Sequence, residues 1–178
     1  MAKGGKLGMI QRPEVSEFSE FYLTYVNSVP DGDLLKILKE NLEKTTAVAE
    51  GLSEKAGQSR YAPGKWSIKE VLGHMTDTER IMSYRLLRIG RGDRTPLAGF
   101  NENDYIDASN FDRLSIQQII EDFTAVRKAT ITLINNMPEE AWENIGVANN
   151  NETTTRALAY IIAGHALHHL KIINERYL

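Results

Sequence analysis

The sequence predicts an all-α protein in which four long helices form a four-helix bundle. Apolar residues recur at helical spacing along four long segments, and two of these segments begin with a capping-box motif. No segment alternates polar and apolar residues for long enough to predict a sheet. Four amphipathic helices in a chain of 178 residues can bury one core, and ligand sites in such bundles lie between facing helices.

The N-terminal region is predicted to contain a leader and one short extra helix. Residues 1–13 are expected to be a flexible leader, because Lys3 and Lys6 are followed by no apolar run typical of a secretion signal. Residues 14–178 are predicted to form a single domain. Its first element is a short helix that ends at Pro30. The apolar residues of this helix are Phe18, Tyr22, Tyr25, Val26 and Val29.

The first two long helices have clear start signals. Asp33 can cap the first helix, which is expected to end near Gly57. A capping box from Ser67 to Glu70 starts the second, and Gly90 ends it. The apolar positions are Leu34, Leu35, Leu38, Leu42, Thr45, Ala49 and Leu52 in the first helix, and Val71, Met75, Met82, Leu86 and Ile89 in the second.

The third and fourth long helices complete the predicted bundle. A second capping box, formed by Ser115 and Gln118, starts the third helix, which ends before Pro138. The fourth helix is expected to run from about Thr154 to the C-terminus.

Two connections between the predicted helices are unusual. The connection over residues 91–114 is longer than most helix-to-helix links, and long loops of this kind often carry function. Three of its residues, Phe100, Asn101 and Tyr105, are therefore candidates for a substrate pocket. The connection over residues 137–153 is expected to hold a turn of helix around Trp142.

Composition excludes several classes of function. There is no cysteine, so the chain can supply neither a thiolate metal ligand nor a cysteine nucleophile, and its composition fits a cytoplasmic protein. The formal net charge of -3 and the lack of a basic block argue against a nucleic-acid partner. No stretch is apolar enough to predict a membrane span.

Three of the four histidines lie close together near the C-terminus. His165 and His169 are four residues apart, so they share the apolar face of the fourth helix, whereas His168 lies at its flank. Two buried imidazoles without partners would each cost about 1–3 kcal/mol, and a shared metal ion would remove that cost. His74 in the second helix could complete three ligands, although a lone histidine on an apolar shoulder is also commonly a hydrogen-bonded structural residue.

Other motifs fit the sequence less well. A di-iron carboxylate bundle needs Glu-x-x-His on two helices, but Glu70 lies four residues before His74 and no acidic residue is near His165. The zincin motif needs a glutamate where Ala166 stands. Residues 63–66 lack the Ser or Thr of a phosphate loop, and no serine lies on a strand-to-helix turn.

Two stretches carry a family resemblance. Residues 66–80 read Trp-Ser-Ile-Lys-Glu-Val-Leu-Gly-His-Met-Thr-Asp-Thr-Glu-Arg, and residues 165–169 read His-Ala-Leu-His-His. Together they resemble the DinB-like (DinB/YfiT) superfamily, and the resemblance extends over residues 34–178. It implies an up-down-down-up four-helix bundle, often a homodimer, that binds one divalent metal ion per chain, typically zinc or nickel.

The resemblance also implies ligands and an activity. Its metal ligands correspond to His74, His165 and His169 here, while Ile172 stands where many relatives have a glutamine. Characterised branches of the family are thiol-dependent, which implies an S-transferase that joins a low-molecular-weight thiol to a small electrophile. Metal binding would convert such a thiol into the reactive thiolate.

Two alternatives to the S-transferase remain open. One is a metal-dependent hydrolase, for which the sequence offers no obvious general base. The other is a non-catalytic bundle that binds metal or dimerises. If the chain binds a metal ion, Asp77, which lies one turn from His74, is a candidate to hold the His74 imidazole in the orientation needed for metal binding.

Overall fold

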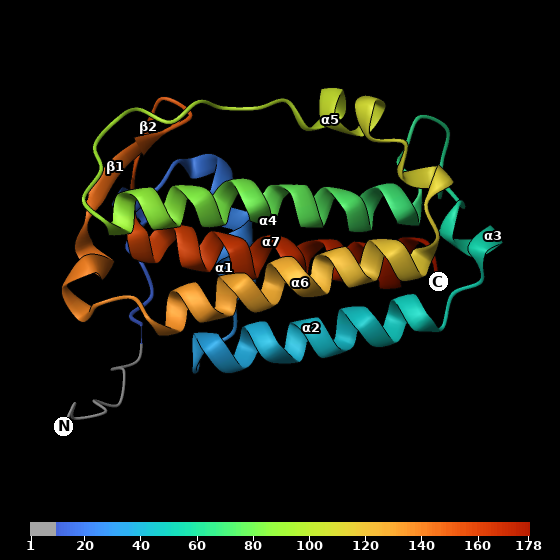
Figure 1. Cartoon of the computed structure of the whole chain (residues 1–178), viewed down its shortest axis with the longest axis horizontal. Coiled ribbons are helices and arrows are strands. Elements are labelled where there is room, and N and C mark those ends of the chain that lie inside the picture. Colours follow the sequence, from blue (N-terminus) through green and yellow to red (C-terminus); the bar gives the residue numbers. More distant parts are fainter. Residues whose placement is uncertain (1–9) are drawn as a thin grey trace.

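The computed structural model describes residues 10–178 and has the predicted four-helix architecture (Figure 1). The long helices are α2 (Leu34–Glu50), α4 (Ile68–Gly90), α6 (Ile116–Asn135) and α7 (Thr155–Arg176). Helix α4 packs against α6 and α7, and α2 packs against the same two helices. Figure 1 shows α2 and α7 running in one direction and α4 and α6 in the other, so the order is up-down-down-up.

The sequence signals at the helix starts are confirmed. Ser67 and Glu70 form a reciprocal capping box at α4, and Ser115 and Gln118 form another at α6. The side chain of Asp33 accepts backbone N–H bonds at the start of α2.

The first long helix ends earlier than predicted. It stops at Glu50, and a separate helix α3 (Glu54–Gly57) follows. Ser53 explains the break, because its hydroxyl accepts a hydrogen bond from the backbone N–H of Ala56 and so caps a new helix. The predicted end near Gly57 was therefore wrong, since the apolar pattern continues across two helices.

The expectation that the chain holds no sheet was also wrong. Strands β1 (Ile145–Ala148) and β2 (Asn151–Thr154) form an antiparallel hairpin in which Ile145 pairs with Thr154. Both residues of its turn, Asn149 and Asn150, have positive φ values of 51° and 62°, as a two-residue type I′ turn requires. Strands of four residues are too short to show a clear alternating pattern. The predicted turn of helix around Trp142 is present as η4 (Glu139–Glu143).

The N-terminal region packs on the bundle through several short elements. They are η1 (Val15–Glu17), η2 (Glu20–Tyr22) and α1 (Leu23–Ser28), in place of the single predicted short helix. Residues 1–9 of the predicted leader lie outside the described residues. The remaining leader residues belong to the domain, because Ile10 is buried and the Arg12 guanidinium donates hydrogen bonds to the carbonyls of Val26 and Val29.

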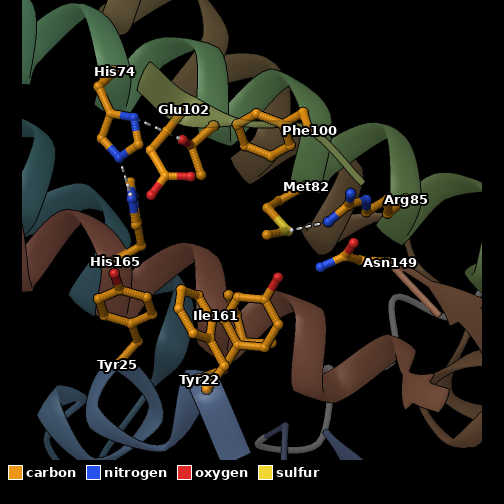
Figure 2. Close-up of a pocket in the computed structure, with 12 residues that line it drawn as sticks. Tyr22, Tyr25, His74, Met82, Arg85, Phe100, Glu102, Asn149, Ile161 and His165 are labelled. Atoms are coloured by element: carbon orange, nitrogen blue, oxygen red, sulfur yellow. Dashed lines mark hydrogen bonds between the residues drawn. The ribbon is translucent and has the colours of Figure 1, made fainter. Parts of the chain in front are cut away.

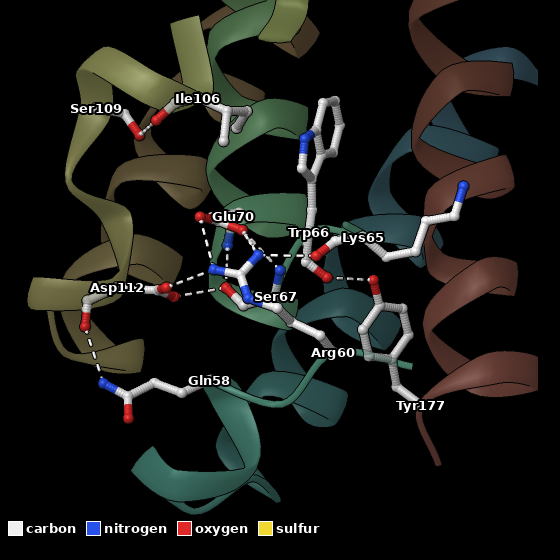
Figure 3. A network of polar contacts seen from close by, with 10 residues as sticks. All are labelled: Gln58, Arg60, Lys65, Trp66, Ser67, Glu70, Ile106, Ser109, Asp112 and Tyr177. Atoms are coloured by element: carbon white, nitrogen blue, oxygen red, sulfur yellow. Dashed lines mark hydrogen bonds and ion pairs between the residues drawn. The ribbon is translucent and has the colours of Figure 1, made fainter. Parts of the chain in front are cut away.

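The long connection over residues 91–114 folds back along α4 and carries α5 (Glu102–Ser109) and η3 (Phe111–Arg113) (Figure 1). A polar network fixes its far end to the start of α4 (Figure 3). Arg60 donates hydrogen bonds to Glu70 and Asp112, at 3.0 and 2.9 Å. The Tyr177 hydroxyl donates to the Trp66 carbonyl at 2.7 Å, which joins the end of α7 to the same network.

The core consists of two apolar clusters, one toward each end of the bundle. Between them lie buried polar side chains, including Glu79 and Arg127 and, where α4 meets α7, His74 and His165. Along residues 10–178, no helix has the length and apolar character needed to cross a membrane.

Candidate metal centre

The structure brings three histidines from two helices into one cluster. His74 projects from α4, and His165 and His169 project from successive turns of α7. One ring nitrogen of each residue lies within 4.8 Å of those of the other two. The closest pair is Nε2 of His74 and Nε2 of His165, which are 3.0 Å apart. These are the three residues that the sequence predicted as ligands.

Burial keeps all three imidazoles neutral at pH 7. His74 and His165 are 8% and 6% exposed. Burial lowers the pKa of His74 to about 4, an effect that the nearby charge of Glu102 partly offsets. Burial and the neighbouring histidines hold the pKa values of His165 and His169 well below the usual value of 6.5. Neutral imidazole is the form that binds metal.

The hydrogen bonding of the cluster is incomplete in a way that a metal ion would satisfy. Within the described part of the chain, the buried Nε2 of His169 has no hydrogen-bond partner. Nε2 of His74 and Nε2 of His165 can share only one proton. Nitrogens bound to one tetrahedral zinc ion lie about 3.3 Å apart, close to the separation of that pair. The donor set therefore fits a divalent metal ion with a preference for nitrogen ligands.

Aromatic rings hold the histidines in place. The Tyr25 ring meets those of His165 and His168 edge-on, with centroids 5.3 and 5.2 Å away. Gly164 permits this approach, because a Cβ atom there would lie 1.9 Å from the Tyr25 carbonyl oxygen. On the other side, the Trp66 ring lies 4.8 Å from that of His74. Helix α1 is thus part of the site.

A cavity of about 280 Å³ opens beside His74 and His165. Figure 2 shows the two imidazoles at one end of it and Arg85 with Asn149 at the other. Other residues that line it include Tyr22, Tyr25, Met82, Phe100, Glu102 and Ile161. The cavity gives the histidine cluster room for a small substrate.

Glu102 is a site residue that the sequence analysis did not select. It lies in the first turn of α5, and its carboxylate points toward the imidazoles of His74 and His165 (Figure 2). Burial raises the pKa of Tyr25, and the negative charge of Glu102 raises it further. The sequence feature that could have indicated Glu102 is Asn101, because a good helix N-cap directly before an acidic residue predicts a helix inside the long connection.

The other candidates for the pocket have different positions. Phe100 lines the cavity, and its contact with a substrate stays a prediction. Asn101 does not line it, because its side chain caps α5 by accepting the N–H of Asn103 at 3.0 Å. Tyr105 lies in a neighbouring groove, with its ring centroid 5.2 Å from that of Phe100. Short polar residues in such a loop favour capping, which explains the wrong prediction for Asn101.

The expectation for Asp77 is corrected by the structure. Its Oδ1 atom lies 3.7 Å from the Arg80 guanidinium, and among the described residues no hydrogen bond joins it to His74. Instead the hydroxyl of Thr78 lies 3.4 Å from Nδ1 of His74. Thr78 comes four residues after His74, so its side chain lies nearly in line with His74 along the helix axis. Asp77 comes three residues after His74, and its side chain is rotated to one side.

Comparisons with known proteins agree with this architecture. The structure resembles that of YfiT from Bacillus subtilis, described as a probable metal-dependent hydrolase with an unusual four-helix bundle topology. The TM-score is 0.73 at 14% sequence identity, over 93% of this chain and 90% of the other. No curated protein sequence matches the chain significantly. The sequence model of the DinB superfamily matches residues 37–173, so the chain belongs to the DinB superfamily.

Proposed function

We propose that this chain is a metal-dependent enzyme that holds one divalent ion, zinc or nickel, through His74, His165 and His169. Three features support the proposal: the imidazoles are neutral, their nitrogens converge, and Nε2 of His169 has no partner among the described residues. Three protein ligands leave a coordination position free, as in catalytic zinc sites. When bound, the ion would act as a Lewis acid and lower the pKa of a water or thiol ligand.

Hydrolysis is the reaction that the geometry supports best, and Glu102 is the observation that carries it. A hydrolase needs a group that takes a proton from the attacking water, and the Glu102 carboxylate points toward the histidines from the cavity side (Figure 2). Burial and the Glu102 charge raise the pKa of Tyr25, so its hydroxyl stays protonated at pH 7. That hydroxyl can donate a hydrogen bond to a carbonyl oxygen of an ester or amide substrate.

The thiol-dependent S-transferase is the second candidate. The chain has no cysteine, so a reacting thiol would come from a small molecule, and the cavity beside the histidines leaves room for one. Glu102 could take the thiol proton just as it could take one from water. The partners would be a low-molecular-weight thiol and a small electrophile. The homodimer and the cytoplasmic location remain predictions.

One assay separates the two reactions. Metal-loaded wild type is tested on activated esters and amides without thiol, and on small electrophiles with glutathione or cysteine. We expect metal-dependent hydrolysis that falls about 100-fold in Glu102→Gln without loss of metal. Asp104→Asn is the control, because this residue is in the same turn of α5 but does not line the cavity. Activity only with thiol would favour the transferase, and equal hydrolysis by Glu102→Gln would contradict the role of Glu102.

A further inference from the structure

The far end of the cavity contains a buried arginine, Arg85, that forms no ion pair with the part of the chain that the structure describes. Arg85 is 2% exposed, yet no carboxylate among the described residues lies within salt-bridge distance of it. Across residues 10–178, two protein acceptors meet its five N–H groups. They are the Ala98 carbonyl at 2.7 Å and Sδ of Met82, a weak acceptor, at 3.5 Å. A buried guanidinium in this state is costly unless molecules in the cavity, an anion above all, meet its free N–H groups.

The Arg85 side chain lines the cavity at the end opposite the histidines (Figure 2). The Phe100 ring lies against the guanidinium, with its centroid 5.9 Å from Cζ. Asn149 points its carboxamide toward the same space (Figure 2). The hairpin turn holds Asn149 close to Gly99, because a Cβ atom at Gly99 would lie 2.0 Å from its Oδ1 atom. Two side chains from separate elements thus present N–H groups at one end of the cavity.

We propose that Arg85 and Asn149 bind the carboxylate of a small organic acid whose reactive group lies at the histidine cluster. A guanidinium fork matches the two oxygens of a carboxylate, and its single charge balances a single anion. Met82, Phe100 and Ile161 lie between the two ends of the cavity and suit an apolar body. The inference rests on the proposed function for the reactive end, but the anion site can be tested without it.

The separation of His74 and Arg85 along α4 sets the length of this substrate. His74 and Arg85 are eleven residues apart, which corresponds to about 16 Å along the helix axis. Side chains on a helix tilt toward its N-terminus, so the guanidinium extends back toward His74. The substrate class is therefore an acid with a spacer of several carbon atoms between its carboxylate and its reactive ester, amide or other electrophilic group.

The test compares acids with their uncharged amides on metal-free protein, so that no carboxylate can bind a metal ion. Butyrate, hexanoate and adipate are titrated against butyramide, hexanamide and adipamide by calorimetry at millimolar concentration. For wild type, we expect at least one acid to bind about tenfold or more tightly than its amide. This preference should disappear in Arg85→Met, which keeps a long apolar stem.

Arg88→Met is the matched control. Arg88 lies on the same helix but pairs with Asp93 and does not line the cavity, so the preference for acids should be unchanged. If Arg85→Met does not fold, Arg85→Lys replaces it, because lysine keeps the charge but loses the fork and should lose much of the preference. The proposal is overturned if wild type binds no acid better than its amide, or if the Arg85 variant keeps the full preference. Either result leaves the metal-dependent reaction open to its own assay.

Discussion

Two polar clusters are buried in the layer between the apolar clusters of the core, and they differ in which of their groups are paired. The first centres on Arg127, which is completely buried. Its guanidinium donates to both carboxylate oxygens of Glu79 at 2.6–2.9 Å. It also donates to the Asn41 side chain and the Leu38 carbonyl, at 3.0 and 3.2 Å. These contacts join α2, α4 and α6 and leave the charge fully compensated.

The second cluster is the set of three histidines between α4 and α7. Its closest polar contact is between two imidazole nitrogens that can share only one proton, and Nε2 of His169 has no partner in residues 10–178. Both clusters are buried, and each leaves one polar atom without a partner among the described residues, which in the first is Nδ2 of Asn41. In the first cluster, however, the charged guanidinium and carboxylate are paired with each other, whereas in the second the unpaired atom is a potential metal ligand. The difference indicates that the Arg127 cluster serves the fold, whereas the histidine cluster is arranged for a bound ion.

The largest effect on stability is expected at the Arg127 cluster. Glu79→Gln leaves the Arg127 charge buried without a counter-ion, so the free energy of unfolding should fall by about 3–5 kcal/mol in urea denaturation. Asp122→Asn is the control, because Asp122 pairs with Arg80 between the same two helices at the surface, where such pairs contribute about 1 kcal/mol or less. Equal losses in the two variants would contradict the assignment of the Arg127 cluster to the fold.

A smaller effect is expected when the open cluster is protonated. The folded-state pKa of His74 is about 4, below the ordinary value of 6.5, so the unfolded chain binds protons first as the pH falls. The free energy of unfolding of metal-free protein should therefore drop between pH 7 and pH 5, by about 2 kcal/mol from His74 alone. Urea denaturation at the two pH values measures this, and His74→Phe should reduce the drop. An unchanged drop in that variant would show that His74 does not cause it.

The smallest effect separates two neighbours of His74. Thr78→Val removes the hydroxyl near Nδ1, so the affinity for zinc should fall about tenfold in a competition titration with a chelator. Asp77→Asn should leave the affinity unchanged, because the carboxylate of Asp77 pairs with Arg80. The reverse result would restore the orienting role predicted for Asp77.

The sequence was sufficient for the bundle and for the approach of the three histidines. Capping boxes at Ser67 and Ser115 mark helix starts through local hydrogen bonds, which depend little on the rest of the fold. The periodicity of the apolar residues places His165 and His169 on the buried face of α7. The family resemblance implied that His74 lies close to these two residues, and the structure has the three histidines in one cluster.

The residues that the sequence analysis missed depend on contacts between distant segments. Glu102 reaches the histidines only because the long connection folds back along α4. Arg85 has the helical position of an ordinary flank residue, and its lack of an acidic partner among the described residues becomes visible only when the neighbouring elements are in place. Asn149 reaches the cavity through a hairpin turn whose strands are too short for a pattern. Such tertiary arrangements leave no local periodic signal.

The central claim is that the histidine cluster binds a metal ion, and metal content tests it most directly. Protein purified without chelator is analysed by elemental analysis for wild type and His165→Ala, with circular dichroism to check folding. We expect about one zinc or nickel ion per wild-type chain and almost none in a variant that stays folded. A wild type that contains no metal and takes up neither added zinc nor added nickel would contradict the claim.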